Sequence, residues 1–236
     1  MKRVRGAATG QGRARRPGVR AAAPGVLTRE RILEAASEMF AERGVEAVSL
    51  RELTLRAGVN LAAVNYHFGS KEGVLAEVFA RSSQPIVRWR LDLLEKVERD
   101  AAGRPVLEQL LDAYLRPALH VGRRQNRSFV RLRARLALER DEMVQGLLAE
   151  CFDESSRSFI EQIALALPDL PRDKLYWRFH FMMGSMFYTM ADPGRIRSLS
   201  DGTCDPGVVE EALPRMIAVY AAVFRDGVSP GAAQQI

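Results

Sequence analysis

The stretch from Ser49 to Glu72 constrains the fold more than any other part of this chain. Ser49 can cap the start of a helix, and Glu52 follows it at the spacing of a capping box. Gly58 stands where that helix would end in a left-handed residue, and Asn60 can then cap a second helix. Two short helices joined by a Gly-containing turn form a helix-turn-helix, whose second helix can lie in the major groove of DNA. The same arrangement also occurs in proteins that bind no DNA, so the spacing alone leaves DNA binding open.

The residues before this stretch predict a further helix. Thr28 can cap it, and apolar side chains then recur at helical spacing, at Ile32, Leu33, Ala36, Met39 and Phe40. Gly44 ends the pattern. We therefore expect a three-helix head over residues 28–72 with its own small apolar core.

The sequence AGVNLAAVNYHFGSKEGVL closes the head and resembles the signature of TetR-type transcriptional regulators. The preceding TRERILEAASEMFAERGVEAVSLRELTLRAG is similar to the first helix and the second-helix entry of that family, so the resemblance covers roughly Thr28 to Phe79. It implies a long helix that links the head to a helical domain for ligand binding and dimerisation. It also implies a homodimeric repressor that binds a palindromic operator and is released by a small apolar or acyl-type ligand.

The head offers ten candidate contacts to double-stranded DNA: Ser49, Arg51, Asn60, Leu61, Ala62, Ala63, Asn65, Tyr66, His67 and Lys71. In TetR-type proteins the positions matching Tyr66 and Lys71 commonly hold phosphates, and those matching Leu61 to Asn65 meet bases. Leu61, Ala62 and Ala63 are apolar where many relatives are polar, so thymine methyl groups and DNA shape should carry more of the selectivity. Asn65 is the best direct reader, because an amide can bond bidentately to adenine. A solvated role for Arg51 and a packing role for His67 fit the sequence equally well.

Charge is distributed unevenly along the chain. The net charge is +6, yet seven of the 35 Lys and Arg residues and none of the 29 acidic ones fall within residues 1–27. The remainder, with 28 basic and 29 acidic residues, is nearly neutral. We expect residues 1–27 to be a disordered tail, either with little role or as a basic arm that contacts phosphates or the minor groove. Contacts of the folded part with DNA must then come from local geometry.

Composition also predicts a cytoplasmic protein. The chain has no stretch of about 18 apolar residues, so we expect no membrane span, and its basic N-terminus lacks the apolar run of a secretory signal. Cys151 and Cys204, with three scattered His residues, give no zinc-type spacing. No metal, cofactor or disulfide is expected.

The rest of the chain is helical by pattern, which makes the expected fold all-α. No run alternates at period two for long, and the pattern favours helices at 106–119, 128–138, 141–167, 172–190 and 206–225. SSQP at 82–85 looks like a break, because Pro85 removes a helix donor, and the resemblance implies a long linking helix that kinks there. Residues 73–228 form the expected second domain and residues 229–236 a C-terminal tail.

The segment 176–190, YWRFHFMMGSMFYTM, is apolar on nearly every side, so its helix needs two partners. We expect it and the last helix to form the homodimer interface, with a ligand pocket nearby. The candidate pocket residues are Phe129, Leu132, Phe152, Phe159, Trp177, His180, Phe181 and Met183. Arg131 and Arg135, at i and i+4, are either a solvated stripe or an anchor for an acidic head group. LPDLPRDKLYWRFHFMMGS is similar to regulators that sense fatty acyl compounds.

Two other classes of function fit the sequence less well. The chain has no G-x-S-x-G, no paired His motif and no Gly-rich phosphate loop, so we do not expect an enzyme. A nonspecific DNA coater that acts through its arginine tail would show a steep salt dependence that disappears when the tail is removed.

Overall fold

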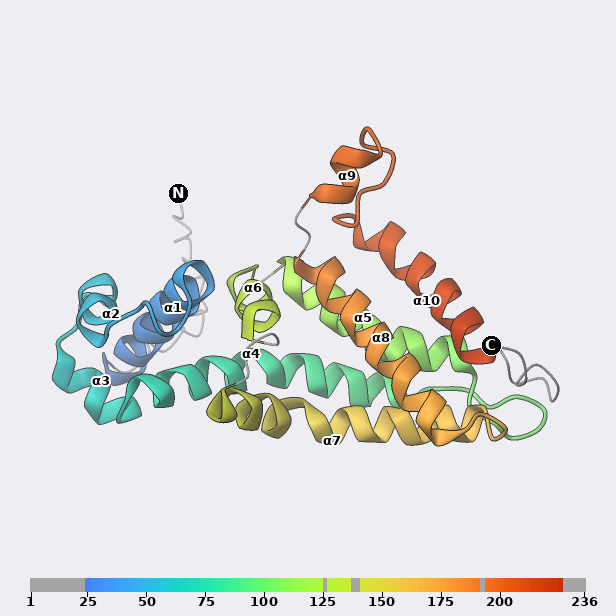
Figure 1. Cartoon of the computed structure of the whole chain (residues 1–236). Helices are drawn as coiled ribbons and strands as arrows, with labels where there is room; N and C mark the ends of the chain where they lie inside the picture. Colours follow the sequence, from blue (N-terminus) through green and yellow to red (C-terminus); the bar gives the residue numbers. More distant parts are fainter. Residues whose placement is uncertain (1–23, 125–126, 137–140, 192–193, 227–236) are drawn as a thin grey trace, which may run out of the picture.

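The computed structural model describes residues 24–124, 127–136, 141–191 and 194–226, and these form ten α-helices, which confirms the all-α prediction (Figure 1). Helices α1–α3 form the head at one end of the elongated molecule, and α4 runs from it along the second domain. Most of the predicted basic tail and the predicted tail at 229–236 lie outside the described residues. Within the described ranges no helix has the length and apolar character that a membrane crossing requires.

The head forms as its capping residues predict, except at its start. Helix α1 spans Pro24–Arg43, so Thr28 lies inside it and the expected cap there is wrong. Pro is favoured in the first turn of a helix, because the N–H that it lacks would have no hydrogen-bond acceptor within the helix there. Helix α2 (Leu50–Ala57) begins after Ser49 and ends at Gly58, which has a left-handed φ of 62°. Helix α3 (Leu61–Phe68) begins after Asn60 and ends at Gly69.

Helix α4 spans Lys71–Leu94 without interruption, so the predicted break at SSQP is wrong. Pro85 lies inside the helix, which must manage without one backbone hydrogen bond. Ser83 Oγ donates to the Ala80 carbonyl at 3.2 Å, and Ile86 is fully buried. Packing on this face therefore holds the helix together across the proline.

The second domain contains helices α5 (Leu107–Arg124), α6 (Arg127–Leu136), α7 (Glu142–Ala166), α8 (Arg172–Ala191), α9 (Arg195–Leu199) and α10 (Val209–Arg225). Five of these match predicted helices to within a few residues. The short α9 was not predicted, because it fills part of a segment rich in Pro, Gly and Asp. Asp141 caps α7, accepting a hydrogen bond from the Val144 N–H at 3.1 Å.

Two apolar clusters form the core. The first joins α1–α4 to α6 and the first half of α7, and Phe40, Phe79 and Phe129 are buried in it. The second joins α5, the end of α7, α8 and α10, around residues such as Tyr114 and Phe179. Because α6 packs against both α1 and α8, the head and the second domain share a continuous framework.

Candidate functional site

Helix α3 presents one face to solvent. Its exposed side chains are Leu61, Ala62, Asn65 and Tyr66. The most prominent of them is Tyr66, with 86% of its surface exposed, whereas Val64 on the opposite face is fully buried. Ala63 and His67 are half-buried, and the His67 ring centroid lies 5.1 Å from that of Tyr66. The structure thus brings four of the predicted DNA contacts, Leu61, Ala62, Asn65 and Tyr66, onto one surface.

Two of the predicted DNA contacts also cap helices. Ser49 Oγ accepts a hydrogen bond from the Glu52 N–H at 3.2 Å, and the Ser49 N–H donates to the Glu52 carboxylate at 3.0 Å. These bonds, with the Arg43 guanidinium 2.8 Å away, lower the pKa of Glu52 to about 2. Asn60 Oδ1 accepts from the Ala63 N–H at 2.9 Å. Both side chains therefore fix a helix N-terminus, where backbone N–H groups favour a phosphate.

Arg51 is exposed on α2 and differs from the other arginines of the head. Among the arginines described between residues 24 and 81, only Arg51 has a side chain with neither an ion pair nor a hydrogen bond, although its backbone carbonyl accepts from Thr54 Oγ1. The other arginines are Arg29, Arg31, Arg43, Arg56 and Arg81, which contact Glu77, the Gly58 carbonyl, Glu52, Glu38 and Glu30 respectively. A guanidinium without an internal partner is available to a DNA phosphate.

Lys71 is tied to the loop between α1 and α2. Its Nζ donates to the Val45 carbonyl at 3.1 Å and lies 3.8 Å from the Glu46 carboxylate. These contacts were not predicted, because the sequence does not show which loop faces the start of α4. An ammonium carries three N–H donors, so the carbonyl contact leaves donors for a phosphate.

Three features of the head were missed by sequence reasoning. Leu55, an apolar residue of α2, is 83% exposed. Arg31 Nη2 donates to the Gly58 carbonyl at 2.9 Å and so braces the turn between α2 and α3. Gly73, in the first turn of α4, lies against the end of α3, where an added Cβ would overlap the Phe68 carbonyl. Close contact between α3 and α4 therefore requires glycine at 73.

The structure separates the predicted ligand residues into two groups. Four are buried, namely Phe129, Leu132, Phe152 and Phe159, and Met183 is half-buried. Trp177, His180 and Phe181 are instead exposed on the outer face of α8, where the Trp177 and Phe181 rings stack with centroids 5.8 Å apart. The eight residues therefore do not line one common pocket in this chain. The side chains of Arg131 and Arg135 lie outside the described part of the structure.

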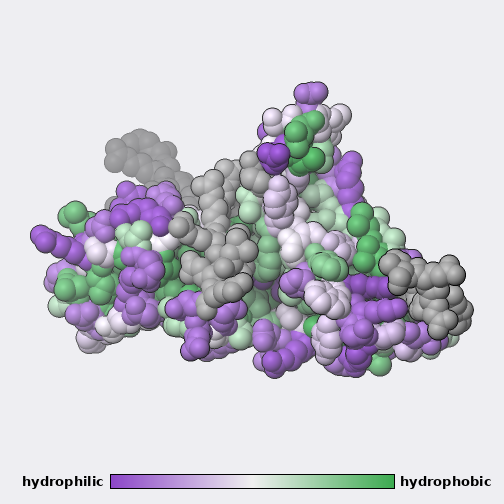
Figure 2. Space-filling view, in the orientation of Figure 1, coloured by the Kyte–Doolittle hydropathy of each residue, from purple (hydrophilic) through white to green (hydrophobic). Residues whose placement is uncertain are grey.

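An apolar surface extends along α8 and α10. On α8 the exposed residues at helical spacing are Tyr176, Trp177, His180, Phe181, Gly184 and Tyr188. The two helices are joined within the subunit, since Tyr220 Oη donates to the Phe181 carbonyl at 3.0 Å and Arg178 Nη1 to the Phe224 carbonyl at 2.9 Å. Figure 2 shows further hydrophobic surface along α10 and on α9. Exposed apolar area of this extent is typical of a protein–protein interface.

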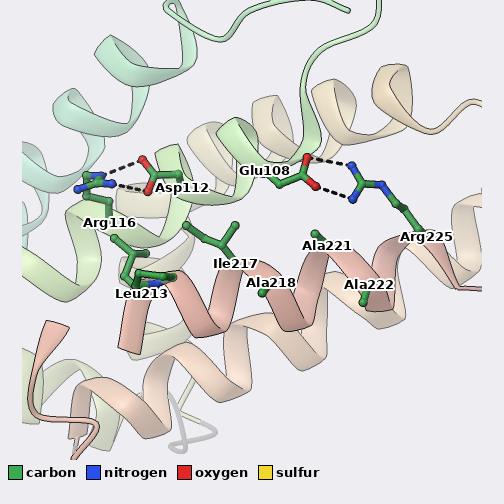
Figure 3. Close-up of a pocket in the computed structure, with 10 residues that line it drawn as sticks. Glu108, Asp112, Arg116, Leu213, Ile217, Ala218, Ala221, Ala222 and Arg225 are labelled. Carbon is green, nitrogen blue, oxygen red and sulfur yellow. Dashed lines mark hydrogen bonds and ion pairs between the residues drawn. The ribbon is translucent and has the colours of Figure 1, made fainter. Parts of the chain in front are cut away.

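A groove of roughly 500 Å³ lies between α5 and α10 (Figure 3). Alanine and leucine side chains of α10 line it, and two ion pairs flank it: Arg116 with Asp112 at 2.6 Å, and Arg225 Nη2 with Glu108 at 2.8 Å. The Arg225 guanidinium lowers the pKa of Glu108. None of the predicted ligand residues lines this groove.

Neither cysteine forms a disulfide, with Cys151 half-buried and Cys204 exposed. Among the residues that the structure describes, no group of three or more His, Cys, Asp or Glu side chains is placed to hold a metal ion.

The capped helix pair, the exposed face of α3 and the long α4 define a helix-turn-helix protein with a separate helical domain. Residues 32–78 match the family model for bacterial regulatory proteins of the tetR family, and residues 112–222 match the tetracyclin repressor-like C-terminal domain. The chain belongs to the TetR family, which consists of transcriptional regulators and not enzymes.

Curated relatives are similar over part of this chain, whereas solved structures match most of it. The HTH-type transcriptional repressor Rv3405c of Mycobacterium tuberculosis is 35% identical over 88 residues, which cover 35% of this chain and 46% of that protein. The chain thus matches about half the length of this relative. The fatty acid degradation regulator FadR from Bacillus halodurans has a TM-score of 0.57 at 14% identity, over 88% of this chain and 98% of its own. The regulator PfmR from Thermus thermophilus has a TM-score of 0.53 at 20% identity, over 83% and 97%. These two structures share the fold.

Proposed function

We propose that this chain is a homodimeric, ligand-responsive transcriptional repressor that binds a palindromic operator through α2 and α3. The observation that carries the proposal is the exposed face of α3, with Asn65 and Tyr66 open to solvent beside two capped helix N-termini. A helix held in this way can enter the major groove, while the helix N-termini and Arg51 contact phosphates. The apolar residues Leu61 and Ala62 favour thymine methyl groups and DNA shape over hydrogen-bonded readout.

A dimer fits both the operator and the surface of the second domain. A palindromic operator requires two heads related by a twofold axis. The exposed aromatic face of α8, joined to α10, supplies an apolar surface that a second copy would cover. Trp177, His180 and Phe181 then belong to this interface.

The effector site is assigned to the second domain. A ligand can release DNA only if it binds one arrangement of the two heads better than the other. Helix α6 packs against α1 and α8, and α4 runs from the head into the second domain, so a change among these helices moves the head.

The proposal is tested by selecting bound DNA from a random library with the purified full-length protein at about 0.15 M salt, a concentration that suppresses weak nonspecific binding. We expect an enriched palindrome that Tyr66→Ala no longer selects. Binding without enrichment, unaffected by Tyr66→Ala, would contradict the proposal. Removing residues 1–23 then shows whether such binding comes from the arginine-rich tail.

Arg51 gives a second test with a matched control. Arg51→Ala removes one phosphate contact, so the slope of log affinity against log salt should fall by about 0.9 and affinity should fall on all sequences alike. Arg157→Ala removes an exposed helical arginine of α7, and we expect it to leave the slope unchanged. If the salt slope were the same for Arg51→Ala and Arg157→Ala, Arg51 would not contact a DNA phosphate.

A further inference from the structure

Arg90, in the middle of α4, is fully buried and has no acidic partner among the described residues. Its Nε donates to the Tyr114 carbonyl at 2.9 Å, and its Nη2 lies 3.7 Å from the sulfur of Met186. The guanidinium carbon lies 3.7 Å from the centroid of the Tyr114 ring. Nη1 has no acceptor within the described part of the chain.

Arg133, on α6, is a second buried guanidinium beside the first. Its carbon lies 3.8 Å from the Phe152 ring centroid and 4.9 Å from that of Phe187. Neither its Nε nor its Nη1 has an acceptor among the described residues. Met186, which contacts Arg90, and Phe187, which contacts Arg133, are neighbours on α8, so both cations face the same turn. Burial, together with the charge of Arg90, lowers the pKa of Arg133 to about 9.

Two unneutralised cations in this position are unfavourable. Taking a charged group out of water is costly, and two like charges in an apolar surrounding also repel each other. An arginine does not escape this cost by losing its proton in a protein. Stacking on aromatic rings recovers only part of it, because a ring is a weak partner compared with a carboxylate. Buried charges are normally paired, so this pair requires an anion.

The surroundings indicate what kind of anion fits. A guanidinium stacked on a ring uses its face, whereas its N–H donors point outward in the guanidinium plane, where a planar carboxylate pairs best. The side chains that contact the pair are aromatic or methionine, namely Tyr114, Phe152, Met186 and Phe187, and such side chains suit an apolar body. The site also lies between the two apolar clusters of the core.

We propose that the effector is a carboxylic acid with an apolar body, whose carboxylate pairs with Arg90 and Arg133 between α4, α6 and α8. As an account of regulation this rests on the proposed function, but binding itself does not. Arg133 is on α6, which packs against α1 of the head, and Arg90 is on α4, which begins at the head. A carboxylate that draws these two helices together therefore acts directly on the elements that position α3.

The test measures thermal unfolding of the full-length protein with matched pairs of acids and neutral amides. The pairs are decanoate with decanamide, and 3-phenylpropionate with 3-phenylpropanamide. A ligand that binds only the folded state raises the Tm, and we expect at least one acid near saturation to raise it by about 3 °C or more over its amide. If no acid stabilises the protein more than its amide, the proposal is overturned.

Arg133→Met separates a binding role from a structural one. Without ligand it should unfold at the same temperature as the wild type or higher, because it removes an unpaired buried charge, and it should lose the shift caused by the acid. Arg157→Met, which removes an exposed arginine paired with Asp153 at 3.4 Å, should keep that shift. Arg133→Gln, which keeps an amide donor, should show a reduced shift. A variant at Arg133 that loses stability yet keeps the acid-dependent shift would make Arg133 structural and overturn the assignment.

The two proposals fail separately. Acid binding without selection of an operator would contradict the repressor and leave the anion site standing. Operator selection with no acid-dependent stabilisation would contradict the anion site and leave the repressor standing.

Discussion

Glu52 makes the stability of the head depend on pH. Hydrogen bonds from Ser49, with Arg43 nearby, lower its pKa from 4.5 to about 2. Because the pKa in the folded state lies below that in the unfolded state, the stabilisation is fully present above pH 4.5 and is lost as the pH falls toward 2. Glu52→Gln keeps a capping side chain but no charge. We expect it to lower the free energy of unfolding at neutral pH, and we expect this difference from the wild type to vanish toward pH 2 in urea unfolding.

Glu34→Gln is the matched control, since it removes one exposed carboxylate from α1. A difference between wild type and Glu52→Gln that stays constant down to pH 2 would show that the charge is not what stabilises the cap. The capping roles of Ser49 and Asn60 could be predicted because a cap depends on residues only three positions apart. The contact of Lys71 with Val45 could not, because it joins residues 26 positions apart that only the fold brings together.

Where α3 meets α4, one glycine sets how closely the helices approach. A Cβ on Gly73 would overlap the Phe68 backbone carbonyl, which cannot swing away as a side chain could. We expect Gly73→Ala to lower the free energy of unfolding by about 2 kcal/mol, as other overpacked sites do, and to weaken operator binding by shifting α3. Thermal unfolding and operator titration would measure the two effects.

Gly146→Ala tests this explanation at a glycine that has no close neighbour. A Cβ on Gly146, inside α7, would have no neighbour within 4 Å, so this change should stabilise the protein by about 0.5–1 kcal/mol through helix propensity alone. If both alanines stabilised the protein, the close approach at Gly73 would be of no consequence. The sequence does not distinguish these two helical glycines, because it does not show what lies opposite each one. The sequence likewise does not show what packs around Pro85. The break predicted there is wrong because this packing outweighs the lost hydrogen bond.

Across the chain as a whole, the sequence predicted the order and type of the helices better than their partners. The apolar character of α8 on nearly every side predicted two partners, and the structure buries one of its faces at Leu175, Phe179, Met182 and Met186, while the second partner stays a prediction. The sequence could not predict which aromatic residues of α8 lie on its exposed face. The eight candidate ligand residues therefore include both buried side chains and side chains exposed on that face. Arg90 and Arg133 were missed for a related reason: a charged residue in a helix is normally solvated, and burial becomes visible only in three dimensions.

The outer face of α8 leads to a prediction about assembly. Phe181 is 57% exposed and stacks on Trp177, which is 62% exposed. If a second subunit covers this face, Phe181→Glu places a charge in an apolar contact, and the dimer should weaken by at least about a hundredfold, since burying an unpaired charge costs several kcal/mol. Sedimentation equilibrium would measure the dissociation constant. Leu55→Glu, at a leucine of the head that is even more exposed, is the control and should leave the dimer intact. If the Phe181→Glu protein dimerised as tightly as wild type, the exposed face of α8 would not be part of the dimer interface.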